Sequence, residues 1–279
     1  MKSLKNLIII SILLLNACMD PIELSIDTFE PMVVVDGEIN DLEEYQKLKL
    51  SISQPYFREG NKSYIEHALV ELYENESKVG VYHYTEEGMY QMEFKGEVGK
   101  DYRVVITLPE IPEFPEFSGK QILSEPETLR AISEITGIRS EYKPESLIFE
   151  EGYYLLINTY DPIGKGDFYR WKLEVNGVIS NEPRHIMVLD DARVDGNAIE
   201  DLDLTLEPLQ VGDKVTVYQQ SISKKHFQFL YDIYMQALTQ EGFFDSPAYN
   251  PNTNLKAEIP AVGYFNVSAY QKAEISIGE

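Results

Sequence analysis

Residues 47–52 read KLKLSI, in which every second position is apolar: Leu48, Leu50 and Ile52. Successive side chains of a β-strand point to opposite faces of the sheet, so this alternation predicts a strand with one buried and one exposed face. The same period of two recurs along the chain, in residues 68–72, 102–106, 169–175, 202–206 and 215–217. The sequence therefore predicts a mainly β protein.

The composition agrees with this fold class and argues against nucleic acid as a partner. The 279 residues include 19 Tyr and 12 Phe, which favour strands, and 17 Gly and 14 Pro, which favour turns. There are 47 acidic residues against 24 Lys and Arg, a net charge of −23. A chain this acidic repels a phosphate backbone, and we expect no nucleic-acid binding.

Two β regions are predicted on either side of a proline-rich connector. Residues 30–108 have glycines at hairpin-turn spacings and are predicted to form an immunoglobulin- or transthyretin-like β-sandwich. Residues 109–118 contain the triplets PEI, PEF and PEF, which a polyproline II helix would arrange with one apolar edge. We expect a stiff connector whose apolar edge packs on its own protein; a docking edge for a partner is the alternative.

Residues 119–279 are predicted to form a second β-rich domain with one helix near residues 223–241. Apolar residues fall at helical spacing there, and Gly242 can adopt the left-handed conformation that ends a helix. The aromatic stripe Phe227, Tyr231 and Tyr234 is expected to pack into the core rather than to bind a ligand.

Residues 1–17 have the pattern of an export signal. Two lysines precede the apolar run LIIISILLL at residues 7–15, which is far shorter than the ~20 residues needed to span a bilayer. Cys18, the only cysteine, follows Leu-Asn-Ala, and the four residues resemble a bacterial lipobox, although Asn16 departs from it. The resemblance implies lipid attachment at Cys18 and a lipidated tether at residues 18–29. The alternative is an ordinary signal peptide.

The familiar catalytic signatures are missing from the sequence. It contains no Gly-x-Ser-x-Gly elbow, no phosphate-binding P-loop and no Gly-x-Gly-x-x-Gly run. Its four histidines are scattered at spacings that match no local zinc motif. We therefore expect a protein that is not an enzyme and that carries no cofactor.

Two stretches are weak candidates for binding. Residues 190–203 are the most acidic, and Asp190, Asp191 and Asp195 are a weak metal candidate, but Arg193 and Leu202 occupy ligand positions of an EF-hand loop. A solvated loop is favoured over a loose surface calcium site. The second stretch is a polar loop with aromatics that could bind a sugar or a partner, or could only cover one end of the fold. Its candidate residues are Phe243, Phe244, Tyr249, Asn250, Asn252 and Asn254.

Several motifs, in order along the chain, resemble a known family. They include VVVDGEI at 33–39, LSISQPY at 50–56, DFYRW at 167–171 and VGYFNV at 262–267. Together with Cys18 they resemble a Bacteroidota outer-membrane lipoprotein family, the domain of unknown function numbered forty-two forty-nine. The resemblance implies an outer-membrane lipoprotein associated with TonB-dependent receptors. It brings no catalytic residues.

The function predicted from these observations is that of a non-enzymatic lipoprotein, held in the outer membrane by its N-terminal lipid and exposed at the cell surface. It would serve a TonB-dependent transporter as an accessory or ligand-binding partner. A stand-alone surface protein that binds glycan or peptide is the alternative, and an extracellular hydrolase is the third hypothesis.

Overall fold

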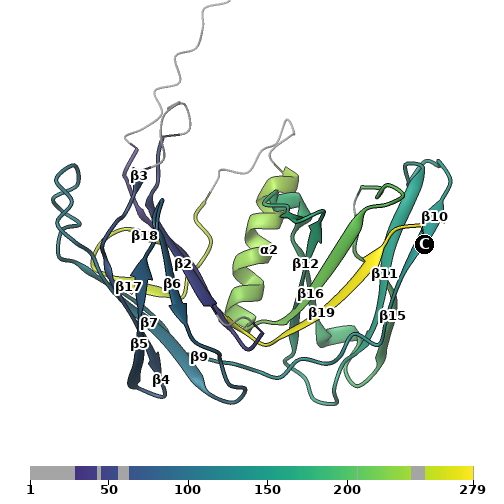
Figure 1. Ribbon diagram of the computed structural model, residues 1–279, viewed down its shortest axis with the longest axis horizontal. Coiled ribbons are helices and arrows are strands. Elements are labelled where there is room, and N and C mark those ends of the chain that lie inside the picture. Colours follow the sequence, from purple (N-terminus) through teal and green to yellow (C-terminus); the bar gives the residue numbers. More distant parts are fainter. Residues whose placement is uncertain (1–28, 43–44, 56–62, 206, 240–248, 279) are drawn as a thin grey trace, which may run out of the picture. The chain divides into compact units, whose positions relative to one another are not determined.

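The computed structural model describes residues 29–42, 45–55, 63–205, 207–239 and 249–278. Residues 31–279 form one compact unit. Within the described ranges the compact unit is built of strands and one α-helix, α2 (Lys224–Thr239), as Figure 1 shows. The prediction of a mainly β protein is confirmed. Cys18 and the predicted signal sequence lie outside the described residues.

The first sheet has eleven strands in the described part of the chain. Its order is β17-β8-β7-β4-β5-β6-β2-β1-β18, with β3 paired to β2 and β9 paired to β7. The strands are β1 (Val33–Asn40), β2 (Tyr45–Ile52), β3 (Ser63–Tyr64), β4 (Leu69–Glu74), β5 (Ser77–Tyr84), β6 (Met89–Glu93), β7 (Asp101–Thr107), β8 (Gln121–Ser124), β9 (Glu127–Thr128), β17 (Leu255–Ala257) and β18 (Ala261–Ser268). The finer prediction of an immunoglobulin- or transthyretin-like sandwich stays a prediction.

One hydrophobic core lies against the inner face of this sheet. Leu48, Leu50 and Ile52, which the alternation placed on a buried face, are at most 4% exposed. The β1–β18 pair is parallel, and it depends on Gly263, whose φ of +102° suits glycine. A Cβ at that position would lie 1.9 Å from the Val35 carbonyl oxygen, so only glycine lets the two strands approach this closely.

The first sheet crosses the predicted boundary between the two β regions. Strands β8, β17 and β18 come from the predicted second domain, residues 119–279, yet they pair within the first sheet. The predicted division into residues 30–108 and 119–279 therefore does not follow the sheets. The physical reason is that the free edge of β1 pairs with β18, which lies far away in the sequence. Val33 pairs with Ala261, 228 residues later.

The proline-rich segment at 109–118 differs from the predicted polyproline II helix. It forms successive turns in which Phe114 N–H donates to the Ile111 carbonyl and Phe117 N–H donates to the Phe114 carbonyl. A polyproline II helix has no such internal hydrogen bonds, but turns of this type also repeat every three residues. Ile111, Phe114 and Phe117 therefore still share one edge, and it packs on the first core, as expected.

Two smaller sheets enclose a second core. A three-stranded sheet contains β10 (Gly137–Lys143), β11 (Gly152–Tyr160) and β15 (Ala198–Asp203). A five-stranded sheet contains β12 (Phe168–Val175), β13 (Val178–Ile179), β14 (Met187–Asp190), β16 (Lys214–Ser221) and β19 (Tyr270–Ser276). Short 3₁₀ turns, η1 (Pro183–His185) and η2 (Asp191–Arg193), flank β14. Trp171 is 3% exposed in this core, where its Nε1 donates to Gln219 Oε1 at 2.9 Å.

The single described helix begins close to the predicted residue. The Ser223 hydroxyl accepts the His226 backbone N–H at 3.1 Å, which satisfies one free donor of the first turn. The buried side chains are His226 and Leu230, whereas Tyr231 is 45% exposed. The prediction that the aromatic stripe forms the core is therefore wrong for Tyr231, because the helix turns a neighbouring face inward.

Candidate ligand-binding cavity

A cavity of about 890 Å³ lies within the compact unit at residues 31–279. Its walls come from β1 and β18 of the first sheet, from β12 of the five-stranded sheet and from α2. Volumes of roughly 300–1,000 Å³ are typical of pockets that enclose small organic ligands. The charged and polar wall residues that matter below are Asp36, Glu38, Arg170, Lys172, His226 and Asn266.

The alternation of β1 and β12 directs four charged side chains toward this cavity. On β1, Val35 and Ile39 face the first core and are fully buried. Side chains alternate along a strand, so Asp36 and Glu38 face the other way and line the cavity. On β12, Tyr169 and Trp171 occupy the second core, and Arg170 and Lys172 likewise line the cavity. Two acids therefore face two bases from different sheets.

One acid and one base of this group are already paired. Lys172 Nζ lies 3.2 Å from Glu38 Oε2, and the Tyr270 hydroxyl donates to the same oxygen at 2.6 Å. Burial raises the pKa of Glu38, but the charge of Lys172 and the Tyr270 hydrogen bond outweigh it and lower the pKa overall. Burial is also the main reason why the pKa of Lys172 is lowered, although Glu38 opposes it. The hydrogen-bonded geometry favours the ionised pair.

The other acid and base have no such partner. Neither the Arg170 guanidinium nor the Asp36 carboxylate makes a hydrogen bond or ion pair with any residue that the structure describes. Burial lowers the pKa of Arg170, yet a guanidinium stays charged at neutral pH. Burial and the neighbouring Glu38 raise the pKa of Asp36, although its side chain is open to the cavity. The two groups attract each other, and Glu38 also attracts Arg170, but none of these interactions is close enough to be a hydrogen bond or an ion pair.

Asn266 is a buried residue with one unsatisfied donor. It is 4% exposed, and its Oδ1 accepts the Ser268 hydroxyl at 2.8 Å and lies 2.7 Å from His226 Nδ1. Its Nδ2 has no hydrogen-bond partner, and the atom itself is buried rather than open to the cavity. Buried donors are nearly always satisfied in native proteins, so this amide is a local exception and not a group that a ligand in the cavity would reach.

The base of α2 is fixed by aromatic and polar contacts. His226 stacks on Tyr264 of β18, with ring centroids 4.4 Å apart and planes inclined by 12°. Burial, together with the positive charge of Arg170, holds the pKa of His226 well below its usual value. The ring is therefore neutral at pH 7, and its Nδ1–H donates to Asn266. Further along the helix, Phe229 and Ile233 make the cavity wall apolar.

A serine–histidine contact also lies on the cavity wall. Ser180 Oγ is 2.7 Å from His185 Nδ1, and Glu182 and Glu207 each approach His185 Nε2 no closer than 4.0 Å. That distance is too long for the hydrogen bond that orients the histidine of a catalytic triad. The serine hydroxyl also accepts the Glu182 backbone N–H at 3.2 Å, so the contact is that of a local turn.

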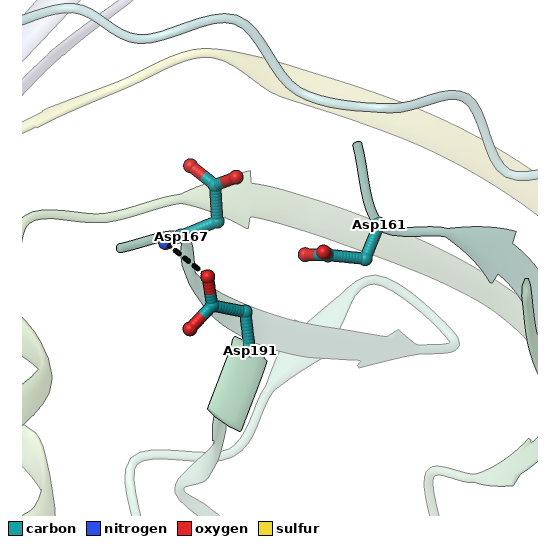
Figure 2. A group of neighbouring side chains, drawn as sticks. All are labelled: Asp161, Asp167 and Asp191. Carbon is teal, nitrogen blue, oxygen red and sulfur yellow. Dashed lines mark hydrogen bonds between the residues drawn. The ribbon is translucent and has the colours of Figure 1, made fainter. Parts of the chain in front are cut away.

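A cluster of three carboxylates lies elsewhere in the unit. Asp161, Asp167 and Asp191 each offer an oxygen within 4.8 Å of the others, as Figure 2 shows. Burial, followed by the charges of Asp161 and Asp191, raises the pKa of Asp167. Asp191 Oδ2 accepts the backbone N–H groups of Gly166 and Asp167 at 2.5 and 3.1 Å. These two hydrogen bonds hold the loop before β12 in place. They also compensate the burial of the Asp191 carboxylate.

Of the three residues predicted as a weak metal candidate, only Asp191 belongs to this cluster. Asp190 caps η2 by accepting the Ala192 N–H, and Asp195 accepts the Gly164 N–H at 2.8 Å. Asp161 and Asp167 were not among the predicted site residues. The run DPIGKGD at 161–167, with an acid at each end of a glycine-containing loop, was the available signal.

The family model described as Domain of unknown function (DUF4249) matches residues 19–274. The chain belongs to this family. No curated protein matches it. In the part of this DUF4249 chain that the structure describes, no helix has the length and apolar character needed to cross a membrane.

Three of the motifs that resemble the DUF4249 family meet at the cavity. Asp36 and Glu38 belong to VVVDGEI, Arg170 belongs to DFYRW, and Asn266 belongs to VGYFNV. These stretches carry the family resemblance, but their charged residues were not among the predicted site residues. The available signal was the presence of charges within otherwise apolar strands.

The predicted binding loop of this DUF4249 chain is only partly described. Phe243 and Phe244 lie outside the described residues, and none of the four other candidates lines the cavity. Tyr249 is 52% exposed, and Asn250 and Asn252 are exposed as well. Asn254 is fully buried, and its side chain bonds both the N–H and the carbonyl of Phe265, at 3.1 and 2.9 Å. Asn254 is therefore a structural residue, which corrects the prediction that it contacts a ligand.

Proposed function

We propose that this chain is a non-enzymatic, ligand-binding lipoprotein of the bacterial outer membrane, an accessory to a TonB-dependent transporter. The observation that carries the proposal is the cavity, which Arg170 and Asp36 line without a hydrogen bond or ion pair to any described residue. Desolvating a charge without a close partner costs stability. Their place on a cavity wall supports a binding role.

The sequence supplies the second element of the proposal, which is attachment. Acylation at Cys18 would place the compact unit after a short tether, at the membrane surface. Two or more acyl chains give stable anchoring, whereas one chain gives only marginal binding. The net charge of −23 favours solubility and disfavours adsorption to anionic lipid, so the cavity would stay open to ligands near a transporter.

The test is purification of the tagged, lipidated protein from its own outer membrane after mild detergent extraction. A co-purifying barrel receptor, together with digestion of the protein when intact cells are treated with protease, is the expected result. Cys18→Ser is the control and should lose membrane attachment. Reproducible isolation of the lipoprotein alone would refute the partnership, and resistance to protease on intact cells would refute surface exposure.

A second candidate function is that of a stand-alone surface protein that binds glycan or peptide through the exposed loop. The exposed ring of Tyr249 favours it, since such aromatics stack on sugars or partner side chains. This function predicts binding of a glycan or peptide array without any receptor, lost on Tyr249→Ala and kept on Arg170→Gln. The reverse pattern would favour the cavity.

A further inference from the structure

We propose that the charged end of the cavity holds a zwitterion, with the ligand's carboxylate on Arg170 and its ammonium on Asp36. The ligand class is a free apolar amino acid or a short apolar peptide with both termini free. This inference rests on the proposed function, because it names the ligand of the same cavity.

The carboxylate end is defined by the free guanidinium of Arg170. A guanidinium presents its N–H groups in a planar fork that matches the two oxygens of a carboxylate. Arg170 lines the cavity and has no hydrogen-bond acceptor among the described residues. Lys172 does not compete for the ligand, because Glu38 already holds it at 3.2 Å.

The ammonium end is defined by the remaining acceptor. Glu38 is occupied by Lys172 and by the Tyr270 hydroxyl, whereas Asp36, two residues earlier on the same face of β1, is paired with no described residue. The two acids and two bases contributed by β1 and β12 sum to zero charge. Asp36 and Arg170 attract each other but form no hydrogen bond or ion pair. A ligand with one positive and one negative group would give each of them a hydrogen-bonded partner, whereas a simple anion or cation would engage only one of them.

The rest of the wall favours an apolar body on this ligand. Phe229, Leu230 and Ile233 of α2 line the cavity together with Leu173 and Met187 from the five-stranded sheet. Aliphatic side chains of a ligand would be removed from water against these residues, which is favourable in proportion to the apolar area buried. The charged end would then fix the orientation, as a few polar groups do in most small-molecule sites.

The experiment uses the lipidated full-length protein in lipid nanodiscs and isothermal titration calorimetry. The probes are L-leucine, leucyl-leucine, N-acetyl-leucyl-leucine, leucyl-leucine amide and the doubly blocked N-acetyl-leucyl-leucine amide. We expect leucyl-leucine or L-leucine to bind, and each blocked terminus to weaken binding about tenfold or more, because a charge-assisted hydrogen bond is lost. Tighter binding of L-leucine would identify the ligand as a free amino acid, and tighter binding of leucyl-leucine would identify it as a short peptide.

Variants assign the two ends separately. Arg170→Gln should lower the affinity for leucyl-leucine about tenfold, so that leucyl-leucine no longer binds more tightly than leucyl-leucine amide. Asp36→Asn should remove the difference in affinity between leucyl-leucine and its N-acetyl form. Arg193→Gln is the matched control, since Arg193 is exposed and does not line the cavity. If Arg170→Gln fails to fold by circular dichroism, the blocked probes on the unaltered protein still decide the question.

Two results would overturn the inference. Equal binding of the free and doubly blocked dipeptides would make the cavity an apolar pocket, and the proposed ligand-binding function would survive. Absence of binding by every probe, with a barrel receptor still co-purifying, would remove the zwitterion but leave the transporter partnership. Failure of the receptor to co-purify, with leucyl-leucine still bound and dependent on Arg170, would instead refute the partnership alone.

Discussion

Replacement of Asn254 by alanine is expected to destabilise the first sheet, although the sequence places this residue in a candidate binding loop. Its side-chain amide bonds the N–H and the carbonyl of Phe265, a fully buried residue of β18. Alanine would leave both backbone groups without partners in a dry site. Each unsatisfied buried group costs about 1–3 kcal/mol, so the loss of both partners should lower the free energy of unfolding by about 2–6 kcal/mol.

Urea unfolding of residues 19–279, followed by circular dichroism, measures this change. Asn252→Ala is the matched control, because Asn252 is exposed two residues earlier in the same loop, and it should change the free energy of unfolding by less than about 0.5 kcal/mol. Equal, small effects of the two substitutions would refute the structural role of Asn254. A large effect of Asn252→Ala would mean that the loop as a whole, rather than the amide pair, supports β18.

Three further predictions concern stability. Gly263→Ala should lower the free energy of unfolding by about 3 kcal/mol or more in urea titrations, since its Cβ would meet the Val35 carbonyl oxygen at a positive φ. The pKa of Glu38 is lowered in the folded state, so its ionised form stabilises the fold above pH 4.5, and this stabilisation is lost as the pH falls through the pKa of the folded protein. Glu38→Gln should therefore reduce the loss of stability at acid pH, measured by urea unfolding between pH 3 and 7. The pKa of His226 is depressed in the folded state, so below pH 6.5 the unfolded chain binds a proton at this histidine that the folded protein does not bind, and stability should fall. The His226 ring signals in NMR should not titrate between pH 6 and 8.

The strands could be predicted from the sequence because their signal is local. Leu48 and Leu50 alternate with lysines, and that alternation alone determines which face is buried. The partner of a strand is not local information. Nothing in the residues around Val33 indicates that β1 pairs with a strand that begins at Ala261, and for this reason the predicted domain boundary does not follow the sheet.

At the connector and in the helix, the sequence pattern fits two arrangements equally well, and this explains why the structure differs from the prediction. Ile111, Phe114 and Phe117 repeat every three residues, and polyproline II and successive 3₁₀-type turns share that repeat. The sequence could therefore predict the common edge but not the conformation. In α2, apolar residues occur on adjacent faces, and the contact of His226 with β18 selects the inward one. Tyr231 is exposed as a result.

The candidate site was the hardest part to predict. Strand alternation assigns Asp36 and Arg170 to the polar faces of their strands, which ordinarily means solvent. Only the packing of two sheets and a helix turns those faces toward one enclosed space. Asp191 was singled out for its acidic neighbours, but the carboxylates that it meets are Asp161 and Asp167, which a loop brings back to it.

The parallel pairing of β1 with β18 also constrains the order in which the protein can mature. A chain is synthesised from its N-terminus, so β1 is available long before Ala261–Ser268 are. Until then one edge of the first sheet is unpaired and one wall of the cavity does not exist. Contacts this distant in sequence form slowly, and exposed strand edges invite aggregation. A chaperone that shields an extended edge would therefore act on this protein during the interval between the synthesis of its first and last strands.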